Sequence, residues 1–160
     1  NIEELIDLML ANGVAAVNII PDRNWNIADP ETRAQKVRLL HEFVALAVGR
    51  DLPVLVGTEI NAYGQRFVDD FSVDEMGPLA GPAFEAGMIF HGHTAMEGAQ
   101  GMGYVSDWAK ARFTTAREKN TFYKTIGELA EPGAKNLFAA VGPEMTPSHV
   151  LATIQMSLKN

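Results

Sequence analysis

Residues 14–26 read VAAVNIIPDRNWN, and the fold predicted from the sequence rests on this segment. Its first part, VAAVNII, is almost entirely apolar, which is typical of a strand buried on both faces of a parallel sheet. Its second part, PDRNWN, carries a carboxylate, a guanidinium and two amides. The predicted strand therefore ends abruptly at a loop that is rich in polar functional groups.

The same transition occurs twice more along the chain. Residues 53–61 read PVLVGTEIN, and residues 87–94 read GMIFHGHT. We expect strands at 14–20, 53–57 and 87–90, each followed by polar residues. In parallel α/β proteins the carboxyl ends of the strands converge on one face, and ligands bind there. Polar side chains from three distant segments would then share one pocket.

Helices are predicted before, between and after these strands. Apolar residues recur at helical spacing after Asn1, and Asp29-Pro30 is typical of an N-cap followed by a first-turn proline, for a helix that runs to Gly49. Further helices are expected around 73–85, 107–118, 120–129 and 146–158. The alternation of strands and helices implies a parallel sheet with outer helices and right-handed connections.

The fold class predicted from this order is α/β, with parallel strands and outer helices in a partial TIM-like (βα) barrel. Residues 1–160 are expected to form a single α/β domain. A closed barrel typically uses about 250 residues, so the chain forms either a small open α/β layer or the later part of a barrel whose first strands lie on another segment or subunit. Because a helix precedes the first predicted strand, we expect the chain to be the C-terminal part of a larger barrel. A truncated barrel has an unpaired sheet edge, so the sequence also predicts self-association or pairing with the missing strands.

Composition limits the classes of function. The chain contains no cysteine, so a metal would be held by nitrogen and oxygen ligands and a cysteine nucleophile is excluded. The net charge of −7 argues against a nucleic-acid partner, which requires clustered Lys and Arg. No stretch approaches the roughly 18 apolar residues that cross a bilayer. Since the first residues are acidic rather than basic, the sequence predicts a cytoplasmic protein with no membrane partner.

The segment GTEIN, residues 57–61, offers a carboxylate and an amide at a predicted strand tip. Because side chains alternate along a strand, Glu59 and Asn61 are expected to point the same way. A carboxylate exposed there could bind a divalent cation or act as a general base. The alternative is a capping or salt-bridging role for Glu59.

His91 and His93 follow the third predicted strand with i, i+2 spacing. If the strand extends through them, both imidazoles face one side, as a pair of zinc or iron ligands would. The alternative is a loop with a solvated histidine. His93 is the stronger ligand candidate, because Thr94 could orient it by hydrogen bonding.

The loop PDRNWN offers groups for both a metal and a substrate. Asp22 could ligate a cation, Arg23 could bind a carboxylate or phosphate through two hydrogen bonds, and Trp25 could form a pocket wall. Asn24 is a further candidate substrate contact. The alternative is an Asx-rich turn, in which Asp22 and Asn24 bond to nearby backbone amides.

Taken together, the segments NIIPDRNWN (18–26), GTE (57–59) and GHT (92–94) resemble strand-end motifs of metal-dependent hydrolases of the PHP type (polymerase and histidinol phosphatase). This family is distantly related to the amidohydrolase barrels. Its members place an Asp-His pair, a Gly-x-Glu motif and a later histidine around a cluster of divalent metals. The resemblance implies that Glu59, His93 and Asp22 are metal ligands. Arg23 stands where the family has a histidine, and the family's opening His-x-His strand would precede Asn1.

The function that we predict on this basis is hydrolysis of a phosphoester, lactone or sugar acid by a metal-activated water. The expected cofactor is a divalent metal, Zn, Mn or Fe, with His91 as a further ligand. The expected catalytic residues are Asp22, Glu59 and His93, and the expected substrate contacts are Arg23, Asn24, Trp25 and Asn61.

Two alternatives remain open at this point. A metal-assisted sugar isomerase would use the same ligand types to polarise a carbonyl group. A non-catalytic ligand-binding or interaction module, in which the metal site has decayed, is supported by the presence of Arg23 in place of a ligand.

Overall fold

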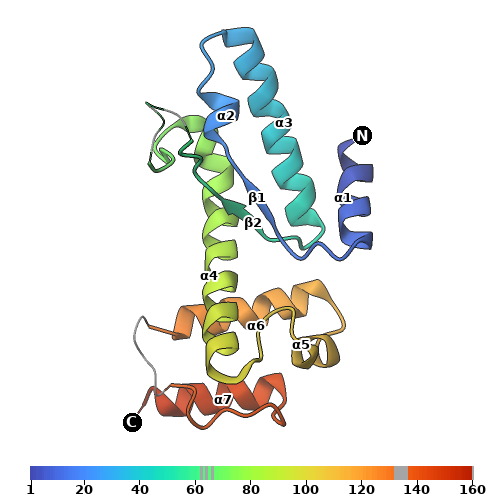
Figure 1. The fold of residues 1–160 in the computed structure, drawn as a ribbon, viewed down its shortest axis with the longest axis vertical. Coiled ribbons are helices and arrows are strands. Elements are labelled where there is room, and N and C mark those ends of the chain that lie inside the picture. Colours follow the sequence, from blue (N-terminus) through green and yellow to red (C-terminus); the bar gives the residue numbers. More distant parts are fainter. Residues whose placement is uncertain (62, 64, 66, 132–136, 160) are drawn as a thin grey trace. The chain divides into compact units, whose positions relative to one another are not determined.

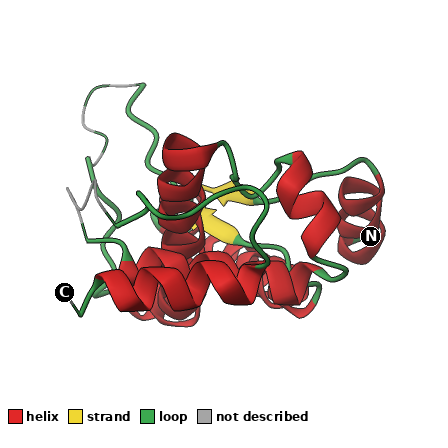
Figure 2. Cartoon of the chain, turned by 90° about the horizontal axis from the view of Figure 1, so that it is seen from below, coloured by secondary structure: helices red, strands yellow, loops and turns green. Residues whose placement is uncertain are grey.

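The computed structural model describes residues 1–61, 63, 65, 67–131 and 137–159 (Figure 1). The chain divides into two compact units, Asn1–Phe84 and Glu85–Asn160, which we call the N-terminal and C-terminal units. Helices predominate in the described residues, and the strands are short (Figure 2). Among the described residues, no helix has the length and apolar character that crossing a membrane requires.

A parallel pair of strands lies at the centre of the N-terminal unit. Its elements, in chain order, are α1 (Ile2–Ala11), β1 (Val17–Ile19), α2 (Asp22–Trp25), α3 (Pro30–Gly49), β2 (Val54–Val56), the 3-10 helix η1 (Asp74–Met76) and the start of α4 (Gly77–Gln100). In the register of the two strands, Val17 lies opposite Val54 and Ile19 lies opposite Val56. The strands predicted at 14–20 and 53–57 are confirmed, although both are shorter than expected.

Helix α3 begins where the sequence predicts. The Asp29 carboxylate accepts a hydrogen bond from the Thr32 backbone N–H at 2.8 Å, and Pro30 occupies the first helical position, where a missing N–H is harmless. This hydrogen bond holds the pKa of Asp29 below its usual value, because it favours the ionised carboxyl. The helix ends at Gly49, also as predicted.

The core of the N-terminal unit forms where α3 packs beside the sheet (Figure 1). Burying one large apolar side chain, such as leucine or valine, stabilises a fold by about 1.5–3 kcal/mol. Contributions come from both strands, from the segment before β2, from α1, α2 and α3, from η1, and from the start of α4. The buried members are Ile6, Val17, Trp25, Leu40, Val44, Ala47, Leu52, Val54, Met76 and Leu79.

The third predicted strand is wrong. Residues 87–90 lie inside helix α4, which continues through Pro82 and through both histidines to Gln100. The buried apolar residues along this helix are spaced by seven, three and seven, a helical period that a window of four residues cannot reveal. They are Leu79, Ala86, Ile89 and Met96.

The C-terminal unit is built from helices in its described residues. The end of α4 is followed by α5 (Asp107–Arg112), α6 (Ala116–Leu129) and α7 (Pro147–Ser157). Helices α4 and α6 touch backbone to backbone at two glycines. A Cβ atom on Gly92 would lie 1.9 Å from the Tyr123 carbonyl oxygen, and one on Gly127 would lie 2.0 Å from the Met88 carbonyl oxygen. No residue with a side chain fits at either position.

The predicted fold class, a partial TIM-like barrel, is therefore wrong. The chain is mostly helical, and its described strands form one open sheet of two parallel strands. The prediction failed because it took three short apolar runs as three strands. One of these runs is instead held in a helix by its close contact with α6.

Candidate functional site

The carboxyl ends of β1 and β2 bring two distant polar segments together. Arg23 lies in α2, directly after β1, and Glu59 lies shortly after the end of β2. Arg23 Nη2 forms an ion pair with Glu59 Oε2. The two residues meet because the strands that precede them are parallel and adjacent, which places both carboxyl ends at the same edge.

Asn61 completes this group of polar side chains. Its Nδ2 donates a hydrogen bond to Glu59 Oε1, and its backbone N–H donates to Gln65 Oε1 at 2.7 Å. The Arg23 side chain is 57% exposed and the Glu59 side chain 29% exposed, so solvent reaches both. We call Arg23, Glu59 and Asn61 the strand-end cluster.

The other predicted residues of the PDRNWN segment have different surroundings. The segment forms the short helix α2 rather than an irregular loop. Asp22 is half-buried and accepts a hydrogen bond from Asn26 Nδ2 at 3.2 Å. Asn24 is half-buried, and its backbone N–H donates to the Pro21 carbonyl at 2.7 Å. Trp25 is buried in the core of the N-terminal unit, so it packs against apolar residues instead of forming the wall of an open pocket.

His91 and His93 belong to the C-terminal unit, where both lie on α4. In a helix, residues two apart point about 200° apart around the axis, so the two imidazoles do not share a face as predicted. His91 Nε2 donates to the Ala130 carbonyl at 2.6 Å, at the end of α6. His93 Nδ1 accepts from the Tyr104 backbone N–H at 2.9 Å. Both histidines hold the backbone of neighbouring segments in place.

The described residues do not provide a ready-made centre for Zn, Mn or Fe. Within the part of the chain that the structure describes, no group of three or more His, Asp or Glu side chains could hold a metal ion. Both oxygens of Glu59 have partners: Oε2 forms the ion pair with Arg23, and Oε1 accepts a hydrogen bond from Asn61. The positive charge of Arg23 would also oppose a cation at this carboxylate.

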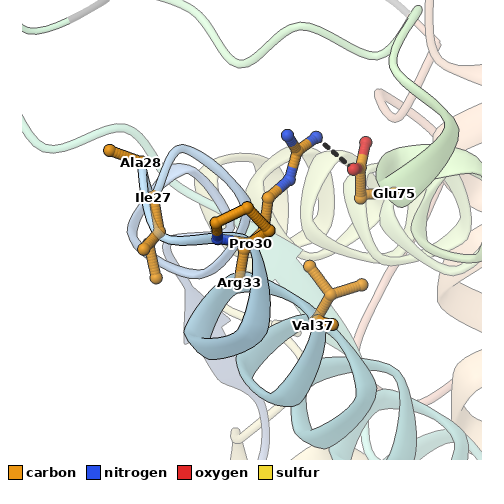
Figure 3. Close-up of a pocket in the computed structure, with 7 residues that line it drawn as sticks. Ile27, Ala28, Pro30, Arg33, Val37 and Glu75 are labelled. Carbon is orange, nitrogen blue, oxygen red and sulfur yellow. Dashed lines mark hydrogen bonds and ion pairs between the residues drawn. The ribbon is translucent and has the colours of Figure 1, made fainter.

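The N-terminal unit also contains a cavity of about 230 Å³ that the sequence did not predict. It lies near the start of α3, and an ion pair between Arg33 and Glu75 forms part of its wall (Figure 3). The remaining wall is apolar. The residues that line the cavity are Ile27, Ala28, Pro30, Arg33, Ala34, Val37 and Glu75.

Glu75 is held in place by its backbone as well as by its side chain. Its carbonyl oxygen accepts a hydrogen bond from His41 Nε2 at 2.7 Å. A hydrogen bond with its own backbone lowers the pKa of the Glu75 carboxyl, burial opposes this, and pairing with Arg33 lowers the pKa further. Sequence reasoning missed this pair because Arg33 and Glu75 are 42 residues apart, and neither belongs to a motif.

Comparisons with protein-family models, with curated proteins and with solved structures found no match. The resemblance to PHP-type hydrolases in the motifs of residues 18–26, 57–59 and 92–94 therefore stays a prediction. The evidence for function comes from the geometry of the chain itself. Within the N-terminal unit, that evidence consists of the strand-end cluster and of the cavity beside Arg33 and Glu75.

Proposed function

We propose that the N-terminal unit binds a small anionic or polyhydroxylated molecule at the strand-end cluster, as a ligand-binding module. The observation that carries this proposal is the ion pair between Arg23 and Glu59 at the carboxyl ends of two adjacent parallel strands. This edge is the usual ligand-binding edge of a parallel sheet. The cluster presents a guanidinium donor, a carboxylate acceptor and an amide that both donates and accepts.

The chemistry of the cluster favours a ligand that carries an acidic group and hydroxyl groups. An arginine has five N–H donors in a planar fork, so Arg23 can bind a carboxylate or phosphate while one of its nitrogens still faces Glu59. A second anionic group next to Glu59 would be repelled, whereas a hydroxyl group can donate a hydrogen bond to that carboxylate. A sugar acid meets both requirements.

Titration of the full chain with gluconate, followed by calorimetry and by amide chemical shifts, tests the proposal. We expect gluconate to perturb the amides near Arg23 and Glu59, and uncharged sorbitol to bind more weakly. Arg23→Gln should weaken gluconate binding about tenfold, which corresponds to 1.4 kcal/mol. The matched control is Arg38→Gln, since Arg38 is an exposed arginine of α3 outside the strand-end cluster. Equal affinity of both variants for gluconate, or no binding by the wild-type chain, would contradict the proposal.

A metal-dependent hydrolase that acts on a phosphoester, lactone or sugar acid is the second candidate. The observation that favours it is the presence of two carboxylates, Asp22 and Glu59, after the ends of adjacent parallel strands. Such an enzyme would have to bind its metal in competition with the Arg23–Glu59 ion pair.

Elemental analysis of the purified protein separates the two candidates. The hydrolase requires stoichiometric Zn, Mn or Fe that is lost in Glu59→Gln and in Asp22→Asn but kept in Glu31→Gln, a control on the exposed Glu31 of α3. It also requires turnover of a chromogenic phosphoester or lactone that a chelator abolishes. Metal-free protein that binds gluconate with unchanged affinity after chelation supports the binding module and rejects the hydrolase.

A further inference from the structure

The cavity at the start of α3 combines one charged pair with apolar walls. Figure 3 shows the Arg33 guanidinium pointing towards the Glu75 carboxylate, with Ile27, Pro30 and Val37 nearby. The Arg33 side chain is 41% exposed and the Glu75 side chain 21% exposed, so the pair is partly shielded but still reachable. The cavity therefore offers a positive group, a negative group and an apolar surface to one occupant.

The backbone at both charged residues is fixed before any ligand arrives, and the ion pair holds the two side chains against each other. Arg33 lies in the first turns of α3, where its backbone N–H donates to the Asp29 carbonyl at 3.0 Å. Glu75 lies in η1, and His41 of α3 donates a hydrogen bond to its backbone carbonyl. A preorganised pair loses little conformational freedom when a ligand binds, which favours affinity.

We propose that this cavity binds a free α-amino acid with an apolar side chain. The carboxylate of the amino acid pairs with Arg33, its ammonium group pairs with Glu75, and its side chain packs against Ile27, Pro30 and Val37. Such a ligand carries both charges and leaves neither member of the protein's ion pair without a partner. A ligand with one charge would separate Arg33 from Glu75 and leave one of them unpaired in a partly buried site.

The size of the cavity agrees with this class of ligand. Pockets for drug-sized molecules are roughly 300–1,000 Å³, and this cavity is smaller, at about 230 Å³. Nucleotides and oligosaccharides would extend far beyond it. The proposed site is distinct from the strand-end cluster, because the two share no residue, and each can be tested without altering the other.

Titration of the full chain with L-leucine, followed by amide chemical shifts, tests the proposal. Two compounds of similar shape serve as comparisons: 4-methylpentanoate keeps the carboxylate but lacks the amine, and 3-methylbutylamine keeps the amine but lacks the carboxylate. We expect leucine to bind at least about tenfold more tightly than either of them. Equal binding of leucine and 4-methylpentanoate would overturn the proposal, and so would the absence of leucine binding.

Variants locate the leucine at the cavity. Arg33→Gln and Glu75→Gln should each weaken leucine binding about tenfold, whereas Arg38→Gln and Glu31→Gln on the same helix should leave it unchanged. Because loss of the ion pair could also disturb the fold, Ala34→Leu gives an independent test: it fills the cavity and keeps both charges. Retention of leucine binding by folded Ala34→Leu would place the ligand elsewhere and reject the site.

Discussion

The strand-end cluster of the N-terminal unit and the histidines of the C-terminal unit come from segments with the same sequence pattern, a short apolar run followed by polar residues. In the N-terminal unit, parallel pairing of β1 with β2 brings Arg23 and Glu59 together at a solvent-accessible edge. In the C-terminal unit, His91 and His93 bind backbone groups of neighbouring segments. The same pattern thus has two outcomes: when the apolar run pairs with a strand, the polar residues after it are accessible to a ligand, and when it packs in a helix, they bind the backbone of neighbouring segments.

Gly57 of the N-terminal unit and Gly92 of the C-terminal unit differ in what a side chain at their position would meet. A Cβ atom on Gly57, after β2, would meet the exposed amide of Asn18 at 2.5 Å. A Cβ atom on Gly92 would meet the Tyr123 backbone carbonyl at 1.9 Å. An exposed side chain can move aside, whereas the backbone of a packed helix cannot. Gly92 is therefore required by the tertiary structure, and Gly57 much less so.

The largest predicted effect is that of Gly92→Ala. The new methyl group has to separate α4 from α6, so we expect the free energy of unfolding to fall by about 3 kcal/mol, at the upper end of the range for overpacked cores. Urea denaturation measures the loss, and hydrogen exchange should show it in the amides of α6.

Gly87→Ala is the matched control for Gly92→Ala, because Gly87 lies on the same helix and nothing lies within 4 Å of the position of its Cβ. Alanine is the better helix former, so this variant should be neutral or more stable by up to about 1 kcal/mol. If both variants were equally stable, the backbone contact between α4 and α6 would be refuted.

The second prediction concerns alkaline pH and the C-terminal unit. Tyr123 is buried and donates its hydroxyl hydrogen to the Met102 carbonyl at 2.7 Å. Burial, and after it the charge of Glu97, raises the pKa of Tyr123 above its usual value of 10.0. The folded state thus holds this proton more tightly than the unfolded state. The contribution of Tyr123 to the free energy of unfolding is therefore fully present below pH 10 and is lost as the pH rises further.

Urea denaturation between pH 9 and pH 12 should show this loss in the wild-type chain. Tyr123→Phe should remove most of the dependence on alkaline pH, although it is less stable at neutral pH. Tyr63→Phe should show the same loss of stability at alkaline pH as the wild-type chain, because Tyr63 of the N-terminal unit is fully exposed. A similar alkaline response in the wild-type chain and in Tyr123→Phe would show that another group is responsible.

The third prediction concerns the structural role of His93, whose Nδ1 accepts a hydrogen bond from the Tyr104 backbone. His93→Ala removes the acceptor for the Tyr104 backbone N–H, so we expect a loss of about 1–2 kcal/mol. His149→Ala, on the exposed His149 of α7, should change the free energy of unfolding little. Nitrogen chemical shifts should show neutral His93 with its proton on Nε2, since Nδ1 accepts a hydrogen bond. A proton on Nδ1 of the neutral ring would contradict this arrangement.

The smallest predicted effect on stability is that of Arg23→Gln. Exposed ion pairs typically contribute less than about 1 kcal/mol, and the Arg23 side chain is 57% exposed. We expect the free energy of unfolding to change by less than that amount, even though ligand binding weakens. A loss of stability as large as that of Gly92→Ala would make the strand-end cluster a structural element and remove the reason to propose a ligand there.

Part of the candidate site could be predicted from the sequence. The position of Arg23 and Glu59 after two strands followed from the apolar runs that precede them, and pairing of those strands was enough to bring the two residues together. The pairing of Arg33 with Glu75 could not be predicted, because these residues come from different elements and only the packing of η1 near α3 makes them neighbours. The contacts of His91 with Ala130 and of His93 with Tyr104 could not be predicted either, because they too join different segments that only packing makes neighbours.

Local features of this fold follow from short stretches of sequence. Capping preferences set the start of α3 at Pro30 and of α7 at Pro147, and β-branched runs set β1 and β2, because such preferences act within a few residues. The helical conformation of residues 87–90, in contrast, depends on contacts with a distant segment. A run of four apolar residues is compatible with a strand or a helix, and the close approach of Gly92 and Gly127 to the backbone of the opposite helix stabilises the helical alternative.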